Sequence, residues 1–79
     1  MDAQILAVVE KNLMRSVDGI EGPIDPQKSF ADYGANSLDI VEIVSASMRE
    51  LKIRIPRTEL AGIKNIGGLV ETFEKFKID

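Results

Sequence analysis

Apolar residues recur at helical spacing in three separate segments, and this pattern restricts the chain to a helical fold. The segments run from Asp2 to about Ser16, from about Ser37 to Leu51, and from about Asn65 to Phe76. Spacings of three and four residues place side chains on one face of a helix, which must then pack against a neighbour. The first and third stripes consist of Ile5, Leu6, Val8, Val9, Leu13, Ile66, Leu69, Val70, Phe73 and Phe76. We therefore predict an all-α domain.

The first connection, from Val17 to Asn36, is long. Gly19, Gly22, Pro23 and Pro26 break the helical pattern within it. A loop of this length is unusual in a compact domain and tends to be functional. We expect three of its apolar residues to hold it against the core: Ile20, Ile24 and Phe30.

The second connection contains a short helix, which makes four helices in all. Ile53 and Ile55 alternate with charged residues before Pro56, which predicts an extended stretch with both isoleucines facing inward. Thr58 is a candidate cap for one turn that Gly62 ends. Asn65 is a candidate cap for the last helix. Gly67 and Gly68, in the first turn of that helix, weaken it by about 1 kcal/mol each if they are exposed.

Composition excludes several classes of function. The 79 residues suffice for one domain, and the absence of Cys and His removes disulfides, thiolate metal sites and catalysis by histidine with serine or cysteine. A net charge of −3 argues against a nucleic-acid binder. No apolar run has the length of a membrane span, and the first residues lack the basic start of a signal peptide. A disulfide-free domain of this size fits the cytoplasm, and the start at Met1 favours a free-standing protein. We expect a protein on which enzymes act, rather than an enzyme.

The middle helix is apolar on two sides. One stripe consists of Ile40, Ile43, Val44, Ser47 and Leu51, and a second of Leu38, Val41, Ser45 and Met48. In so small a domain only one stripe can be fully buried. The other is either a flank of a wide core or an exposed contact surface. We expect Ile43, Val44 and Leu51 in the core and Met48 on a surface that partners contact.

Ser37 lies where the long loop becomes the middle helix, within the segment FADYGANSLD, residues 30–39. Serine is among the commonest residues at a helix N-cap, so the residue is open to a purely structural interpretation. A serine hydroxyl at a helix N-terminus is also well placed to bear a phosphate, because backbone N–H groups and the helix dipole favour negative charge there.

The segment around Ser37 resembles the attachment motif of acyl carrier proteins. The resemblance covers the whole chain: Gly34 matches the glycine before the serine, and Ile55-Pro56 the junction before the third helix. It implies a single acyl carrier domain, 1–79, with a four-helix carrier-protein bundle and no catalytic residue. It also implies a 4'-phosphopantetheine arm on Ser37, which a phosphopantetheinyl transferase moves from coenzyme A with Mg²⁺. It further implies a monomer that carries acyl groups on the arm as thioesters. The surface that partner enzymes contact would then consist of Leu38, Asp39, Glu42, Met48 and Arg57.

A closer likeness is to stand-alone donor carriers of polyketide β-branching cassettes, and its most specific part is the run from Ile55 to Gly67. This likeness implies acetyl transfer to a hydroxymethylglutaryl-synthase-like (HMG-synthase-like) enzyme. Asn36 stands where the carrier family most often has aspartate, and Met48 and Arg49 stand where fatty-acid carriers tend to be acidic. A fatty-acid, modular polyketide or peptidyl carrier, and a helical adaptor without an arm, stay open as alternatives.

Overall fold

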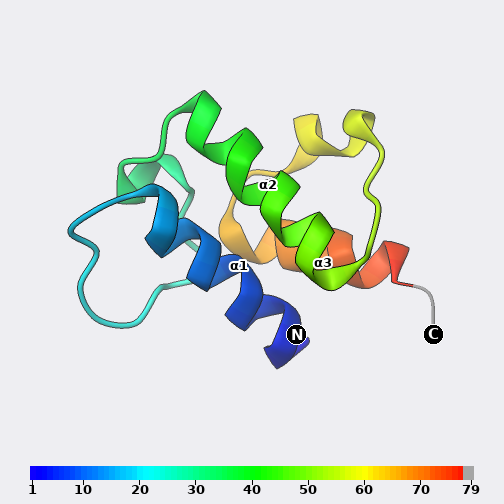
Figure 1. Cartoon of the computed structure of the whole chain (residues 1–79), viewed down its shortest axis with the longest axis horizontal. Coiled ribbons are helices and arrows are strands. Elements are labelled where there is room, and N and C mark those ends of the chain that lie inside the picture. The colour runs from blue at the N-terminus through cyan, green and yellow to red at the C-terminus, as the bar shows by residue number, and fades with distance from the viewer. Residues whose placement is uncertain (78–79) are drawn as a thin grey trace.

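Three α-helices and two short 3₁₀ helices form the part of the chain that the computed structural model describes, residues 1–77. The α-helices are α1 (Ala3–Ser16), α2 (Ser37–Leu51) and α3 (Ile66–Phe76), and the 3₁₀ helices are η1 (Ala31–Tyr33) and η2 (Arg57–Gly62). Helix α1 packs against both α2 and α3 (Figure 1). This part of the chain contains no strand, so the all-α prediction is confirmed. The predicted domain extends to Asp79, and residues 78–79 lie outside the described part.

The α-helices begin and end within one residue of their predicted limits, because side-chain caps fix their first turns. The Asp2 carboxylate accepts hydrogen bonds from the backbone N–H groups of Gln4 and Ile5 at 2.9 and 3.1 Å. Asn65 caps α3 as predicted, accepting from the Gly68 N–H at 2.7 Å. These bonds satisfy donors that the first turn of a helix leaves without an internal partner.

The predicted cap at Thr58 is wrong. Helix η2 begins one residue earlier, at Arg57, and no side chain caps it. The carbonyl of Pro56 accepts from the Glu59 N–H at 3.0 Å, so the backbone itself closes the first turn. A 3₁₀ turn formed in this way needs no cap from a threonine.

The core lies between the three α-helices and is closed by the two connections. Ile53 and Ile55 are both buried, as their alternation with charged residues predicts. The long loop is held against the core by buried Ile24 and Phe30 and by half-buried Ile20, which confirms that expectation too. The side chains with no exposed surface are Val9, Leu13, Ile43, Ser47, Ile66, Leu69, Val70 and Phe73.

One polar pair lies inside this core, between α1 and α2. The Asn12 side-chain amide donates to the Ser47 hydroxyl at 3.0 Å, and both residues are buried. A buried polar group without a partner would cost about 1–3 kcal/mol of stability. The hydrogen bond between Asn12 and Ser47 avoids this cost for both side chains. The pair also favours one register of α1 against α2, because a sliding helix would separate the two groups.

The long loop also contacts the start of α3, at a glycine. The Gly67 N–H donates to the Pro26 carbonyl at 2.7 Å, and the Ile66 N–H donates to the Lys28 carbonyl at 3.0 Å. A Cβ on Gly67 would lie 3.2 Å from the Pro26 oxygen, which its own hydrogen bond holds in place. Gly67 is therefore buried rather than exposed, and it permits a close approach of two backbones.

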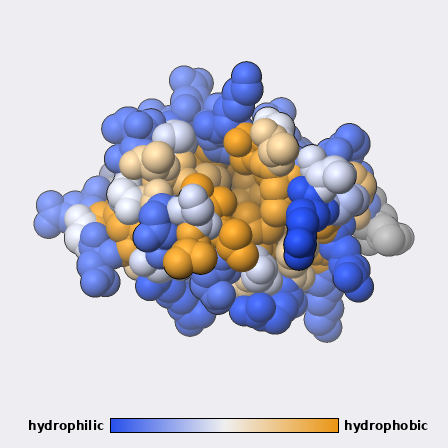
Figure 2. Space-filling model, turned by 90° about the horizontal axis from the view of Figure 1, so that it is seen from above, coloured by the Kyte–Doolittle hydropathy of each residue, from blue (hydrophilic) through white to orange (hydrophobic). Residues whose placement is uncertain are grey.

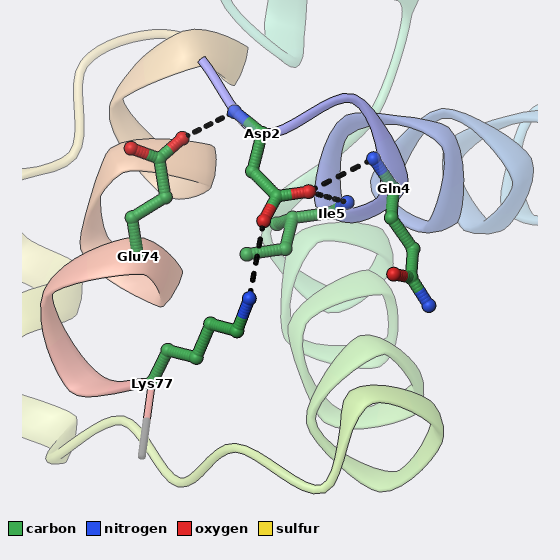
Figure 3. Close-up of polar contacts among 5 residues, drawn as sticks. All are labelled: Asp2, Gln4, Ile5, Glu74 and Lys77. Carbon is green, nitrogen blue, oxygen red and sulfur yellow. Dashed lines mark hydrogen bonds and ion pairs between the residues drawn. The ribbon is translucent and has the colours of Figure 1, made fainter. Parts of the chain in front are cut away.

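Asp2 joins the start of α1 to the end of α3, as Figure 3 shows. Its backbone N–H donates to Glu74 Oε2 at 2.7 Å, and its carboxylate forms an ion pair with Lys77 at 3.5 Å. The backbone N–H of Ile5, with further help from Gln4 and Lys77, lowers the pKa of the Asp2 carboxyl below its usual value of 3.8. The ionised carboxylate is the form that these contacts stabilise.

Asp2→Asn should lower the thermal unfolding midpoint at neutral pH and have less effect in acid. A folded-state pKa below the unfolded value means that the stabilisation is present above the unfolded pKa and is lost as pH falls through the folded pKa. Asparagine still caps the helix but carries no charge. Thermal melts of both proteins from about pH 7 to about pH 3 should therefore show a gap that closes with acidification. A gap that stays constant over this range would contradict the role given to the carboxylate.

Candidate attachment and partner site

Asn36, not Ser37, caps helix α2. The Asn36 side-chain oxygen accepts from the Asp39 N–H at 2.8 Å, and the Asp39 carboxylate accepts from the Asn36 N–H at 3.0 Å. This reciprocal pair is a capping box, which satisfies two backbone donors at once. Ser37 is therefore the first residue of the helix, and the interpretation of Ser37 as a cap is wrong. Both residue types are good caps, and the register of the helix start decides between them.

The Ser37 side chain is exposed, and its hydroxyl makes no hydrogen bond within residues 1–77. The capping box leaves this oxygen free for chemistry while it holds the backbone on either side of it. At the first turn of α2 the helix dipole also favours a negative group. A phosphodiester on this hydroxyl thus fits the local charge and would require no rearrangement of the cap.

The turn before Ser37 is fixed by backbone bonds and by one tyrosine. Gly34 has a φ of 92°, a conformation that glycine adopts without strain, and its N–H donates to the Ala31 carbonyl at 2.9 Å. The next residue, Ala35, is buried. The Tyr33 hydroxyl accepts from the Asp25 N–H at 2.7 Å, which ties this turn to the middle of the long loop. The serine therefore stands on a well-ordered junction rather than on a loose loop.

The two stripes of α2 separate in the way that an exposed contact surface requires. Ile43 and Val44 are buried, whereas Leu38 and Val41 are 79 % and 58 % exposed. Leu51 is only half-buried, which corrects its predicted place in the core: it lies in the last turn, at the edge of the core. The apolar surface next to Ser37 is therefore formed by Leu38 and Val41.

The structure places the other predicted partner residues in different environments. Asp39 is engaged in the capping box, and Glu42 forms an exposed ion pair with Arg49 at 3.5 Å. Met48 is half-buried against the core, and its sulfur accepts from the Ile55 N–H at 3.4 Å. Arg57 is exposed at the start of η2. Only part of the Met48 side chain is thus accessible to a partner.

A groove that the sequence did not reveal runs between α2 and η2, with a volume of about 770 Å³. Figure 2 shows an apolar hollow in the middle of the face that α2 and η2 share. Its apolar lining comes from Val41, Val44, Met48, Ile55, Pro56, Leu60 and Phe76. Arg54 and Arg57 add two cations to the lining. Val41, Ser45 and Met48 of the second stripe therefore line one wall of the groove, whereas Leu38 lies outside it.

The described residues contain neither a metal-binding cluster nor a membrane-spanning helix. Residues 1–77 hold no group of three acidic, histidine or cysteine side chains that could bind a metal ion. Within the same part of the chain, no helix combines the length and the apolar character needed to cross a membrane. Ser37 is thus an exposed serine at a capped helix start, beside the apolar surface of Leu38 and Val41.

Comparison with known proteins shows the family of the chain. Residues 3–73 match the family profile described as "Phosphopantetheine attachment site". A polyketide biosynthesis acyl-carrier-protein of Bacillus subtilis, AcpK, is 37% identical over 73 residues, which are 90% of this chain and 89% of that protein. An acyl carrier protein of Helicobacter pylori strain J99 is 35% identical over 75 residues, 94% of this chain and 91% of that protein. No solved structure matches the chain.

The chain belongs to the phosphopantetheine attachment family and is an acyl carrier protein. Its cofactor is phosphopantetheine, and it acts as a carrier rather than as an enzyme. It is related to a carrier protein of polyketide biosynthesis.

Proposed function

We propose that Ser37 carries the 4'-phosphopantetheine arm. The observation that supports this is its exposed hydroxyl, free of hydrogen bonds within the described residues, at a helix start capped by its neighbours. Ser37 supplies the oxygen that forms the phosphodiester, while Asn36 and Asp39 hold the backbone around it. The arm supplies a terminal thiol that binds acyl groups as thioesters.

The assignment of Ser37 requires a separate phosphopantetheinyl transferase, with coenzyme A as donor and Mg²⁺ as the metal. The Ser37 oxygen attacks the phosphorus of the pantetheine phosphate, and the diphosphate bond of coenzyme A breaks. Adenosine 3',5'-bisphosphate is the leaving group, and the hydroxyl proton passes to a base. The chain offers no histidine to accept that proton, so we assign the base to the transferase. Intact mass after incubation with a broad transferase and coenzyme A, followed by mapping of the modified peptide, tests the assignment.

The pathway that we propose is polyketide β-branching, with this protein as the acetyl donor to an HMG-synthase-like enzyme. Its relative AcpK is named for polyketide biosynthesis, which supports the broader pathway. Fatty-acid carriers tend to be acidic in the second half of α2, whereas this chain is basic there and just beyond it, which supports a different partner. The basic residues are Arg49, Lys52, Arg54 and Arg57. Leu38, Asp39, Glu42, Met48 and Arg57 are the proposed contact residues. We propose further that residues 1–79 form one carrier domain that acts as a cytoplasmic monomer.

Reversing the charge of two basic residues should weaken this transfer. We expect the double variant Arg49→Glu and Arg57→Glu to transfer acetyl to its HMG-synthase-like partner about tenfold more slowly at low salt, because rim charges act mainly on association rate. Both side chains are exposed, so the fold should tolerate the changes. High salt screens such charges, so the difference between the proteins should shrink as salt rises. Rates of acyl transfer at low and high salt measure the effect.

Arg15→Glu is the matched control, because Arg15 is exposed on α1 and outside the proposed surface. It should transfer at nearly the wild-type rate. A fatty-acid carrier loaded with acetyl should serve the same enzyme much less well than the wild-type protein does. Equal rates for the wild type and the double variant at both salt concentrations would remove the support for this partner.

A further inference from the structure

Two arginines in the groove between α2 and η2 have no acidic partner among the described residues. Arg54 and Arg57 both line the groove, and neither forms an ion pair within residues 1–77. Arg49, which lies nearby on α2, differs in that it pairs with Glu42. The groove thus combines an apolar lining with two cations that no acidic side chain of the described chain neutralises.

The groove lies within reach of a group attached to Ser37. By the rise of 1.5 Å per residue, Val41 lies about 6 Å and Met48 about 16 Å along α2 from Ser37. A phosphopantetheine arm has the backbone length of four to five extended residues, which is roughly 15 Å. An acyl group at the end of the arm can therefore enter the groove if the arm lies along the helix.

We propose that Arg54 and Arg57 bind the free carboxylate of acyl groups that end in one, so that the groove retains such a dicarboxylic cargo. This inference rests on the assignment of the arm to Ser37. Guanidinium groups form paired, charge-assisted hydrogen bonds with a carboxylate. Meanwhile the methylene groups of the cargo would contact the apolar lining. An acetyl group has neither a carboxylate nor methylene groups, so it stays available to a partner enzyme.

The test compares two cargoes of equal chain length without any partner enzyme. A broad transferase loads the wild type and the variant Arg54→Gln/Arg57→Gln with adipoyl or hexanoyl arms from the corresponding coenzyme A esters. Hydroxylamine then cleaves the thioester, and its rate reports how well the protein shields the cargo. We expect the adipoyl thioester of the variant to be cleaved about threefold faster than that of the wild type. This factor is what the loss of an exposed ion pair typically produces. The hexanoyl thioester should be cleaved at the same rate in both proteins.

Each outcome supports or overturns the proposal. If the wild type and the double variant cleave the adipoyl thioester at the same rate once salt is high, the proposal is supported. It is also supported if the control Arg15→Gln, outside the groove, protects the adipoyl thioester as well as the wild type does. Equal adipoyl rates in the wild type and the double variant overturn it. An equal increase for both cargoes in the variant also overturns it, since the arginines would then act only through their aliphatic stems. Intact mass before cleavage separates these results from a failure to load Ser37, which would overturn the proposed function as well.

Discussion

Ser37→Ala will fold like the wild type and accept no phosphopantetheine arm. The substitution removes the only atom that we expect to form the phosphodiester, so arm addition should fall below detection. The cap of α2 stays intact, because Asn36 and Asp39 form it. Loss of an exposed hydroxyl that makes no hydrogen bond within the described residues should change the free energy of unfolding by less than about 0.5 kcal/mol. Intact mass after treatment with a transferase and coenzyme A, together with a denaturant melt, measures both parts.

Two control variants separate the cap from the attachment point. Asn36→Ala removes the cap and should cost about 1 kcal/mol, yet it keeps the hydroxyl and should still gain an arm. Ser16→Ala changes a serine at the end of α1 and should gain the arm at the wild-type rate. A full mass gain on Ser37→Ala would show that another residue bears the arm, and the assignment would fail.

Local sequence signals located the helices because those signals are local in the structure too. Apolar spacing and the residues Asp2 and Asn65 set the limits of α1 and α3, and both side chains act within one turn of their own positions. The cap of α2 was harder to place, since Asn36 and Ser37 are adjacent and equally suitable by type. Only the folded backbone, in which Asn36 is extended and Ser37 is helical, distinguishes them.

Contacts between distant segments could not be predicted from such signals. In the sequence Gly67 indicates a weak helix, but in the structure its N–H donates to the Pro26 carbonyl and its lack of a Cβ lets the loop pack closely. Asn12 resembles a surface residue, and its burial depends on Ser47 of another helix. The groove has the same origin, because Met48, Arg54 and Phe76 meet only after η2 and α3 have packed.

Exposure along α2 follows from this packing as well. The apolar pattern predicts Leu51 as a core residue and Met48 as a surface residue, whereas both are half-buried and pack against the core. Alanine at either position should therefore cost a similar, intermediate amount. The stronger contrast lies between Ile43, which has no exposed surface, and Val41, which is 58 % exposed on the same helix.

Ile43→Ala should cost about 2–5 kcal/mol, because it removes buried methyl and methylene groups and leaves a cavity. For 79 residues the whole free energy of unfolding is about 4–12 kcal/mol, so this single change would consume a large part of it. Val41→Ala should change stability by less than about 1 kcal/mol, since alanine favours the helix and the lost surface was mostly in water. Denaturant melts with equal slopes for all proteins give these values.

The same pair of variants also separates stability from recognition. Val41 lies next to the attachment turn and in the groove wall, so Val41→Ala should slow acyl transfer to a partner although the protein stays folded. Ile43 has no exposed surface. At temperatures where the Ile43→Ala variant is still folded, it should therefore transfer acyl groups at the wild-type rate. Equal stability losses in the two variants would mean that α2 does not present one buried and one exposed stripe. In that case the exposed stripe could not serve as the contact surface, and the partner would have to recognise another face of the protein.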